Sequence, residues 1–524
     1  MEDKDQTYLR LAEPRKKGLM SLLFSRFFLI VILLLIQIMI YVSILSWLQK
    51  YTTHFMVIQF VFVLVMVAFL FNSSIDNSAK LTWMFFISIL PFMGAVMFWF
   101  TQTNLGHRTM KRRVEQLIEK TKNAIPQQEN VINEISGCSD GTDDLATYLG
   151  RSSCHPVFKN TEVKYFPTGE AKFAAMLEEL KKAEKFIFME YFIVEEGYMW
   201  GKILEILIEK AKAGVDVRVM YDGMCEVSLL PSNYCELLAE RGIRAKAFSP
   251  IKPLLSSHYN YRDHRKILVI DGKVAFNGGV NLADEYINRV ERFGHWKDTA
   301  VMLKGDAVRS FTLMFLQMWN ITEDNDVFDP YIGSTGYAPA NPDGYVIPYG
   351  DCPLDKDKAG ESVYMDMLYR AQDYVHIMTP YLILDGELEA AMKYAAERGV
   401  DVKLILPGIP DKKPPYALAK SHYKSLNNSG VKIYEYTPGF IHAKVAVSDN
   451  CKAIVGTINM DYRSLYHHFE CATYMYKTSC ISDIEADFQD TLSKCTPVTE
   501  YSIKNEKLSY KLMGIVMKFI APLI

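Results

Sequence analysis

The sequence predicts an α/β protein in which N-terminal transmembrane helices precede two duplicated α/β lobes related by a pseudo-two-fold axis. Three observations carry this prediction: an apolar N-terminal region, a repeat of alternating helix and strand patterns, and a short polar motif that occurs once in each repeat. The expected parts are a tail at 1–22, two to three transmembrane helices at 23–101, a linker at 102–160, a first lobe at 161–330, a second lobe at 331–500 and a C-terminal amphipathic helix at 501–524.

Composition excludes several classes of protein. The chain has 524 residues, of which 49% are hydrophobic and 23% are charged, so it is neither disordered throughout nor a many-span transporter. The net charge of −3 excludes a globally basic nucleic-acid binder. Nine cysteines without CxxC spacing indicate mostly free thiols in a reducing compartment.

Three apolar runs, at 27–47, 55–71 and 81–100, are each about as long as the ~20 residues that cross a bilayer. Basic residues flank them on both sides, at 15–17 and at 108–113. The positive-inside rule places both flanks in the cytoplasm, which requires an even number of crossings. One run is therefore interfacial, or one flank breaks the rule. We expect a multi-pass protein with a cytoplasmic catalytic domain.

The repeat lies between residues 160 and 500. Residues 183–193 and 371–383 each show the end of a helix followed by a strand, and a further helical pattern comes next in each case. Residues 214–219 and 399–404 then begin with glycine and continue as a strand. Glycine suits the C-cap of a helix, and the alternation indicates parallel strands joined by crossover helices.

Each lobe carries the pattern His-x-Lys-x4-Asp, followed by Gly-Gly or Gly-Thr and then an asparagine. The residues are His264, Lys266, Asp271 and Asn281 in the first lobe, and His442, Lys444, Asp449 and Asn459 in the second. His and Lys two apart on a strand point to one face. The aspartate belongs to the catalytic motif but lies at odd parity and at a hairpin turn. We expect it to accept local backbone hydrogen bonds.

These residue types favour phosphodiester chemistry. Two lysines and two asparagines form a donor-rich pocket for one phosphate, and two imidazoles can divide the nucleophile and acid roles. Lysine is not a usual metal ligand, so we expect no metal and no cofactor. Asp298 and Glu470 follow the two motifs and are the candidates to orient the histidines. The alternative is that each is a surface carboxylate.

The duplicated motif resembles that of the phospholipase D superfamily. The apolar N-terminus with residues 80–94, together with residues 260–266, 456–464 and 521–524, resembles the bacterial cardiolipin synthases. Two departures are an apparent extra N-terminal span and Ala521, where the family often has serine. The resemblance covers the chain from about residue 80 to its end.

This resemblance implies that two phosphatidylglycerols give cardiolipin and glycerol through a phosphohistidine. Carried over by motif, His264 is the nucleophile, and His442 is the general acid and then the base; the symmetry of the sequence leaves this order open. Lys266, Lys444, Asn281 and Asn459 hold the phosphate. The expected partners are phosphatidylglycerol, other anionic lipids and the bacterial plasma membrane, with no nucleic acid. The alternatives are a hydrolytic phospholipase D, a serine phosphatidyltransferase, a membrane-tethered nuclease and a non-enzymatic scaffold.

Two further segments suggest contacts. Residues 501–524 place four lysines among apolar residues, which indicates a basic amphipathic helix on an anionic lipid surface or, alternatively, a helix packed on the domain. Residues 296–319 are rich in aromatic side chains. Phe311, Phe315 and Trp319 lie at helical spacing, which favours a core helix over a lipid groove.

Overall fold

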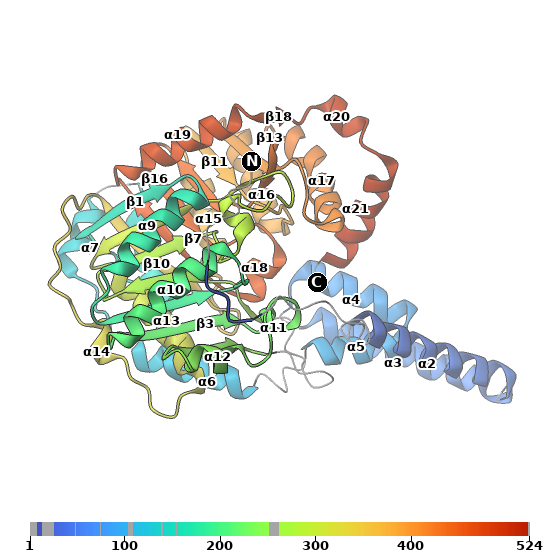
Figure 1. Cartoon of the computed structure of the whole chain (residues 1–524). Coiled ribbons are helices and arrows are strands. Elements are labelled where there is room, and N and C mark those ends of the chain that lie inside the picture. Colours follow the sequence, from blue (N-terminus) through green and yellow to red (C-terminus); the bar gives the residue numbers. More distant parts are fainter. Residues whose placement is uncertain are drawn as a thin grey trace. The chain divides into compact units, whose positions relative to one another are not determined.

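The computed structural model describes residues 8–12, 26–47, 49–73, 75–102, 108–137, 140–153, 155–250 and 261–521. They fall into two compact units, shown in Figure 1. The large unit comprises residues 1–15, 110–250 and 260–515, and the apolar unit comprises 16–109, 251–259 and 516–524, in each case as far as they are described. Most of the expected tail 1–22, the basic residues 15–17, Asn260, Cys138 and Cys154 lie outside the described residues.

The large unit is built on two mixed β-sheets. The strands of the first are β1 (Thr161–Phe166), β2 (Phe186–Tyr191), β3 (Asp216–Asp222), β4 (Arg244–Phe248), β6 (Lys266–Ile270), β7 (Val274–Gly278) and β9 (Ala300–Gly305). The strands of the second are β10 (Tyr345–Asp351), β11 (Tyr374–Met378), β12 (Asp401–Pro407), β13 (Lys432–Tyr436), β15 (Val445–Ser448), β16 (Lys452–Gly456), β17 (His468–Tyr476) and β18 (Cys495–Pro497).

Both sheets arrange their strands in the same way. The first has the order β1-β9-β7-β6-β2-β3-β4, and the second has the order β10-β17-β16-β15-β11-β12-β13, with β18 added at its edge. In each sheet three neighbouring strands are parallel and the remaining pairs are antiparallel. Asp271-Gly272 joins β6 to β7 and Asp449-Asn450 joins β15 to β16. All four of these residues have positive φ, so the two hairpins expected from the sequence are confirmed.

Helices form layers around the two sheets. The helices α9 (Gly169–Lys181), α10 (Tyr198–Lys212) and α12 (Tyr234–Ala239) share a core with the outer face of the first sheet. The helices α15 (Ala359–Arg370), α16 (Gly386–Glu397) and α17 (Lys413–Asn428) do the same on the second sheet. Two helices, α13 (Val308–Trp319) and α19 (Cys480–Leu492), share the core between the sheets.

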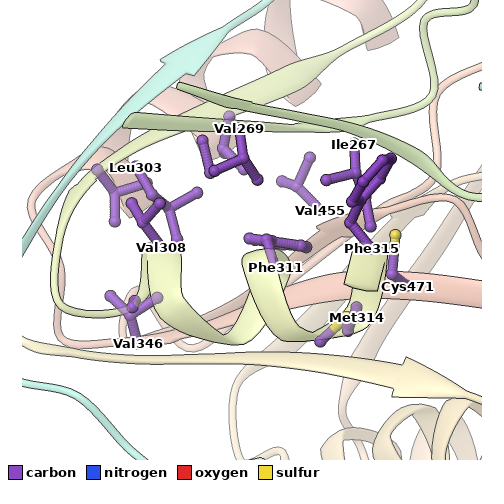
Figure 2. Close-up of a cluster of buried hydrophobic side chains, with 14 of the residues drawn as sticks. Ile267, Val269, Leu303, Val308, Phe311, Met314, Phe315, Val346, Val455 and Cys471 are labelled. Carbon is purple, nitrogen blue, oxygen red and sulfur yellow. The ribbon is translucent and has the colours of Figure 1, made fainter. Parts of the chain in front are cut away.

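The central core joins the two sheets through α13. Figure 2 shows its side chains beside Val269 and Leu303 of the first sheet and Val455 of the second. Phe311 and Phe315 are fully buried, and each such side chain stabilises the fold by about 1.5–3 kcal/mol. The interpretation of residues 296–319 as containing a core helix is therefore confirmed.

The expected linker at 102–160 contains helices that belong to the large unit. These are α6 (Arg108–Thr121), α7 (Glu129–Ser136) and α8 (Thr142–Ser153), and Leu117, Ile135 and Leu149 from them are buried in its cores. A linker was the wrong expectation for this segment, because its apolar residues recur at helical spacing. The other short elements are α11 (Cys225–Ser228), η2 (Asp284–Ile287), η3 (Asn320–Thr322), α14 (Asp329–Ile332), α18 (Tyr462–Tyr466), α20 (Glu500–Lys504) and α21 (Leu508–Ile520).

The apolar unit contains α2 (Arg26–Ser46), η1 (Gln49–Tyr51), α3 (Thr52–Phe71), α4 (Asn77–Ile89) and α5 (Pro91–Gln102). Among the described residues one helical segment, Gln49–Phe71, is long and apolar enough to cross a membrane, and Ile32–Ile44 is a shorter apolar stretch. The expected third span at 81–100 is not one helix. It is divided at Leu90, whose backbone is not helical, because Pro91 cannot continue the hydrogen-bond ladder.

Candidate active site

Two short strands bring the motifs of the two lobes together. β5 (Arg262–Asp263) precedes His264 and pairs with the start of β17, which leads to Glu470. β14 (Gly439–Ile441) precedes His442 and pairs with β8 (His295–Lys297), which leads to Asp298. The backbone N–H of His264 donates to Phe469 O at 2.9 Å, and that of His442 donates to Lys297 O at 2.7 Å. The two connections are reciprocal.

Because of this strand pairing, each motif histidine lies beside the carboxylate that follows the other motif. His264 Nδ1 lies 2.9 Å and 3.0 Å from the two carboxylate oxygens of Glu470, and His442 Nδ1 lies 2.6 Å from Asp298 Oδ2. Each histidine therefore bonds the carboxylate that follows the other motif. A carboxylate accepts the Nδ1 proton, so the lone pair of each neutral imidazole is on Nε2. Nε2 is then the atom available for chemistry.

Burial controls the charge of the imidazoles. It lowers the pKa of His442 to about 4, with the charge of Lys444 acting in the same direction. It also holds the pKa of His264 well below its ordinary value, against the opposing charge of Glu470. Both histidines are therefore neutral near pH 7 in the free protein. A bound phosphodiester adds a negative charge, which favours their protonated form.

The two motif lysines are buried beside the histidines. Lys266 Nζ donates to His264 O at 2.6 Å, and Lys444 Nζ donates to the backbone oxygen of His442. Burial lowers the pKa of Lys266 to about 8 and that of Lys444 to about 7. The charge of Lys266 also lowers the pKa of Lys444 and of His442. The two motifs thus lie close enough for their charges to act on one another.

The two asparagines are buried but differ in their contacts. Asn281 Oδ1 accepts from Ile193 N at 3.1 Å, and its Nδ2 donates to the Tyr286 hydroxyl at 2.8 Å. Asn459 Oδ1 has no hydrogen-bond partner within the described part of the chain. The second Nδ2 hydrogen of Asn281 and the side chain of Asn459 are the groups left to meet a ligand.

The motif aspartates lie outside the site, which corrects their placement among the catalytic residues. Asp271 accepts from the backbone N–H groups of Glu184, Lys185 and Phe186 at 2.7–2.9 Å. Asp449 accepts in the same way from residues 372, 373 and 374 at 2.9–3.0 Å. These partners are about 75–87 residues away rather than local, because each aspartate lies beside the start of the neighbouring antiparallel strand. Their role is structural.

The Gly-Gly and Gly-Thr pairs support the two carboxylates differently. A Cβ on Gly279 would lie 2.0 Å from Asp298 Oδ1 and 3.0 Å from His442 O, so this position has room only for glycine. The equivalent Thr457 instead donates its hydroxyl proton to Glu470 Oε2. Gly279 therefore leaves space for Asp298, whereas Thr457 gives Glu470 an additional hydrogen bond.

Sequence reasoning did not select a third histidine in the site. The ring centroid of His468 lies 5.4 Å from that of His264, and its Nδ1 lies 3.5 Å from Glu470 Oε1. Trp296 has the corresponding place in the other half, with its ring 5.3 Å from His442. Each stands two residues before a carboxylate on a strand, and this spacing puts both on the site face. Both His468 and Trp296 could therefore have been identified from their spacing to the carboxylates in the sequence.

A buried lysine was also missed. Lys172 on α9 is fully buried, and its Nζ donates to Val280 O at 3.1 Å. Burial lowers its pKa to about 7, and the charges of Asp298 and Lys266 also act on it. No local pattern marks a single lysine on a helix about a hundred residues before the motif, so its place depends on the tertiary fold.

Two groups of described residues could offer ligand atoms to a metal ion: His264, His468 and Glu470, and Glu361, Asp385 and Glu387. In the first group His264 and Glu470 are already hydrogen bonded to each other, and the charge of Lys266 acts on the same imidazole. A neighbouring cation disfavours a second one. Metal independence remains a prediction.

Comparison with known proteins identifies the family. Residues 176–319 and 364–492, just over half of the chain, match a family described as "Cardiolipin synthase, PLD-like domain", where PLD denotes phospholipase D. The chain belongs to this family. The two matched segments contain both copies of the motif and both orienting carboxylates. The resemblance of the duplicated motif to the cardiolipin synthases of the phospholipase D superfamily is thus confirmed.

Relatives extend the similarity beyond the two matched segments. An "Uncharacterized protein" of Streptococcus mutans is 56% identical over 458 residues, which cover 87% of this chain and 99% of that protein. A "Cardiolipin synthase" of Alkalihalophilus pseudofirmus is 33% identical over 451 residues, covering 85% and 88%. The crystal structure of a phosphatidylserine synthase from Haemophilus influenzae matches 73% of this chain and 97% of that chain, with a TM-score of 0.57 and 13% identity. That likeness shows the fold alone.

Proposed function

We propose that this protein is a cardiolipin synthase, which transfers the phosphatidyl group of one phosphatidylglycerol to the terminal hydroxyl of another and releases glycerol. The observation that carries the proposal is the pair of crossed bonds, His264 to Glu470 and His442 to Asp298. They present two Nε2 atoms and two buried lysines to one site in a chain of the cardiolipin synthase family.

In the first half of the reaction, His264 Nε2 attacks the phosphorus of the donor lipid. Binding of the anionic donor lipid first lets His442 take up a proton from water on Nε2. The bond between phosphorus and the glycerol headgroup oxygen then breaks, and that oxygen takes this proton from His442 Nε2. Glycerol leaves, and the phosphatidyl group stays on His264. The negative charge of Glu470 stabilises the positive charge that develops on His264 during the attack.

In the second half, His442 Nε2 takes the proton of the acceptor hydroxyl. The acceptor oxygen then attacks phosphorus, the phosphorus–nitrogen bond breaks, and cardiolipin forms with His264 regenerated. Lys266 and Lys444 hold the non-bridging oxygens with Asn281 and Asn459, so that the charge on the phosphate is balanced throughout. Every proton that is given up is recovered, and no metal takes part in the sequence.

The architecture supports a duplication. The two sheets have the same strand order, and the contacts between the motifs are reciprocal. Two phospholipase D-like lobes related by a pseudo-two-fold axis would produce both features, because such an axis exchanges His264 with His442 and Glu470 with Asp298. The site then lies where the two lobes meet, and neither lobe is complete alone.

We also assign the protein to the bacterial plasma membrane as a multi-pass protein, with the catalytic domain in the cytoplasm. The helical segment Gln49–Phe71 supports this assignment by its length and composition. The C-terminal helix α21 supports it as well, because its row Leu508, Leu512 and Ile515 is 55–69% exposed. On its packed side a Cβ on Gly514 would lie 2.6 Å from Ala417 O of α17. One face therefore packs on the protein, and the apolar face remains for anionic lipid.

The products of the purified full-length enzyme test the function. Phosphatidylglycerol in detergent micelles should give cardiolipin and glycerol in equal amounts by mass spectrometry. Phosphatidic acid without cardiolipin would instead show a hydrolase, and phosphatidylserine formed on addition of serine would show a different acceptor. His442→Ala, prepared in the same way, controls for contaminating activity.

A further inference from the structure

The third apolar run folds back on itself at Leu90 and Pro91. A Cβ on Gly94 of α5 would lie 3.0 Å from the backbone Cα of Ile87 in α4. The rings of Trp83 and Phe98 are 5.4 Å apart. In one straight helix these two rings would stand about 22 Å apart, at 1.5 Å per residue. The helices α4 and α5 are therefore an antiparallel hairpin that closes at Gly94.

The hairpin is too short to cross a bilayer. Its helices have 13 and 12 residues, which correspond to about 20 Å and 18 Å, whereas the hydrocarbon layer is ~30 Å thick. Its entrance is polar, because the Asp76 side chain accepts from Ser78 N at 2.9 Å and from Ala79 N at 3.1 Å. Further in, Leu81, Phe85 and Ile89 form one stripe of α4 and are 50–68% exposed. That stripe suits lipid chains.

Contacts at the tip give its depth. Met93 N donates to Gln37 Oε1 at 2.9 Å, and Gln37 is buried near the middle of α2. The ring of Phe92 lies 5.8 Å from that of Phe62, which is near the middle of α3. A free N–H in hydrocarbon is costly, and the Gln37 side chain removes that cost at the start of α5. The tip thus stands level with the midpoints of both long helices.

The C-terminus of the chain packs against the same hairpin. Thr82 Oγ1, near the middle of α4, donates to Phe519 O at 2.9 Å. The ring of Phe519 lies 4.6 Å from that of Phe85 and 5.7 Å from that of Phe86. These contacts place the last turn of α21 beside the middle of α4.

We propose that α4 and α5 form a re-entrant hairpin that enters the bilayer to mid-depth and returns to the face from which it came. This inference rests on the proposed membrane location. The helices α2 and α3 are then the two crossings, and the hairpin adds none. The basic residues at 15–17 and at 108–113 fall on one face, as the positive-inside rule requires.

Cysteine accessibility in cells tests the hairpin in the full chain. Four single variants, Gln49→Cys, Asn77→Cys, Ile89→Cys and Thr109→Cys, are treated with an impermeant maleimide before and after permeabilisation. Labelled sites are assigned by peptide mass spectrometry, so the native cysteines stay in place. Position 49 should react in intact cells, and positions 77 and 109 only after permeabilisation. Position 89 should react only after solubilisation in denaturing detergent.

The outcomes separate the two claims. If positions 77 and 109 react from opposite faces while 89 stays protected, the segment crosses the membrane once and the hairpin proposal is overturned. If Ile89→Cys reacts as readily as Gln49→Cys without detergent, this unit is not in a bilayer and the proposed location fails. Cardiolipin formation by each variant shows that the chain is folded.

Discussion

The two halves of the site contain the same three groups, a histidine, a lysine and a carboxylate bonded to the histidine, but the side chains around each histidine differ. His264 has Glu470 and a second imidazole, His468, beside it, and the Thr457 hydroxyl holds Glu470. His442 has Asp298, Lys444 at 2.9 Å from its Nδ1, and the indole of Trp296. The two motifs therefore contain the same residue types but have different neighbours.

This difference gives a physical basis for unequal roles. In the His264 half one carboxylate serves two imidazoles, and the charge of His468 helps to lower the pKa of His264. Such an environment favours the neutral, nucleophilic form. In the other half an ammonium group and an aromatic wall surround His442. The motifs alone are symmetric in sequence, so the distinction comes from the position of Lys444 and from His468 and Trp296 outside the motifs.

Removing the orienting carboxylates should have the largest effect. Glu470→Gln and Asp298→Asn should each lower kcat for cardiolipin formation by roughly 10²–10⁴, because the imidazole loses its negative acceptor. Because the pairs are crossed, Glu470→Gln should impair His264 and Asp298→Asn should impair His442. Steady-state kinetics measure the loss, and Glu387→Gln, an exposed carboxylate, is the matched control. Full activity of either site variant would contradict the crossed pairing.

The lysines should set the alkaline limb of the pH profile. Burial has lowered their pKa values to about 7 for Lys444 and about 8 for Lys266, so both lose their charge as pH rises through this range. The value of kcat/KM for phosphatidylglycerol should therefore fall between pH 7 and 9, approaching about tenfold per pH unit while one lysine is discharged and about a hundredfold per pH unit above pH 8, where both are. Bound phosphate favours the charged lysines, so kcat should persist to higher pH. A flat kcat/KM over this range would disprove the assignment.

The residues next to the histidines should have a smaller effect that distinguishes the halves. The charge of His468 lowers the pKa of His264, so its removal in His468→Asn should raise that pKa. The acid limb of kcat/KM should then move to higher pH, while kcat/KM near neutral pH changes little because burial still holds the pKa of His264 low. Trp296→Phe carries no charge change and should leave this limb in place. Equal pH profiles of the two variants would remove the proposed asymmetry.

The motif aspartates should affect stability rather than catalysis. Asp271→Asn keeps a residue that tolerates positive φ but removes a charged acceptor of three N–H groups, and should cost about 1–2 kcal/mol. Asp449→Asn should cost less, because Asp449 is more exposed. Thermal unfolding with kcat measured per folded molecule checks both. A loss of kcat by 10²-fold or more in the folded variants would return the aspartates to the active site.

Local chemistry made some features predictable and left others to the tertiary fold. Asp271-Gly272 and Asp449-Asn450 fixed two hairpins, and the spacing of Phe311 and Phe315 fixed a core helix, since each depends on neighbouring residues only. The crossed bonds were not predictable. They depend on two- and three-residue strands that pair segments about 140 to 200 residues apart, and such strands have no periodicity of their own.

Two expectations failed although the sequence held the signal. Pro91 in the middle of an apolar run indicates the end of a helix, but the length of the run outweighed it. The segment 108–153 has apolar residues at helical spacing, including Val114 and Leu117, and its polar composition suggested a linker. In both cases a local signal, the proline or the helical spacing of apolar residues, was more informative than the overall hydrophobicity or polarity of the segment.

The most direct test of unequal roles is to trap the covalent intermediate. His264→Ala and His442→Ala are each incubated with phosphatidylglycerol, quenched at alkaline pH and mapped by peptide mass spectrometry. The account predicts a phosphatidyl adduct on His264 in His442→Ala, where the acceptor cannot be deprotonated, and no adduct in His264→Ala. An adduct on His442 in His264→Ala, with none in His442→Ala, would contradict it.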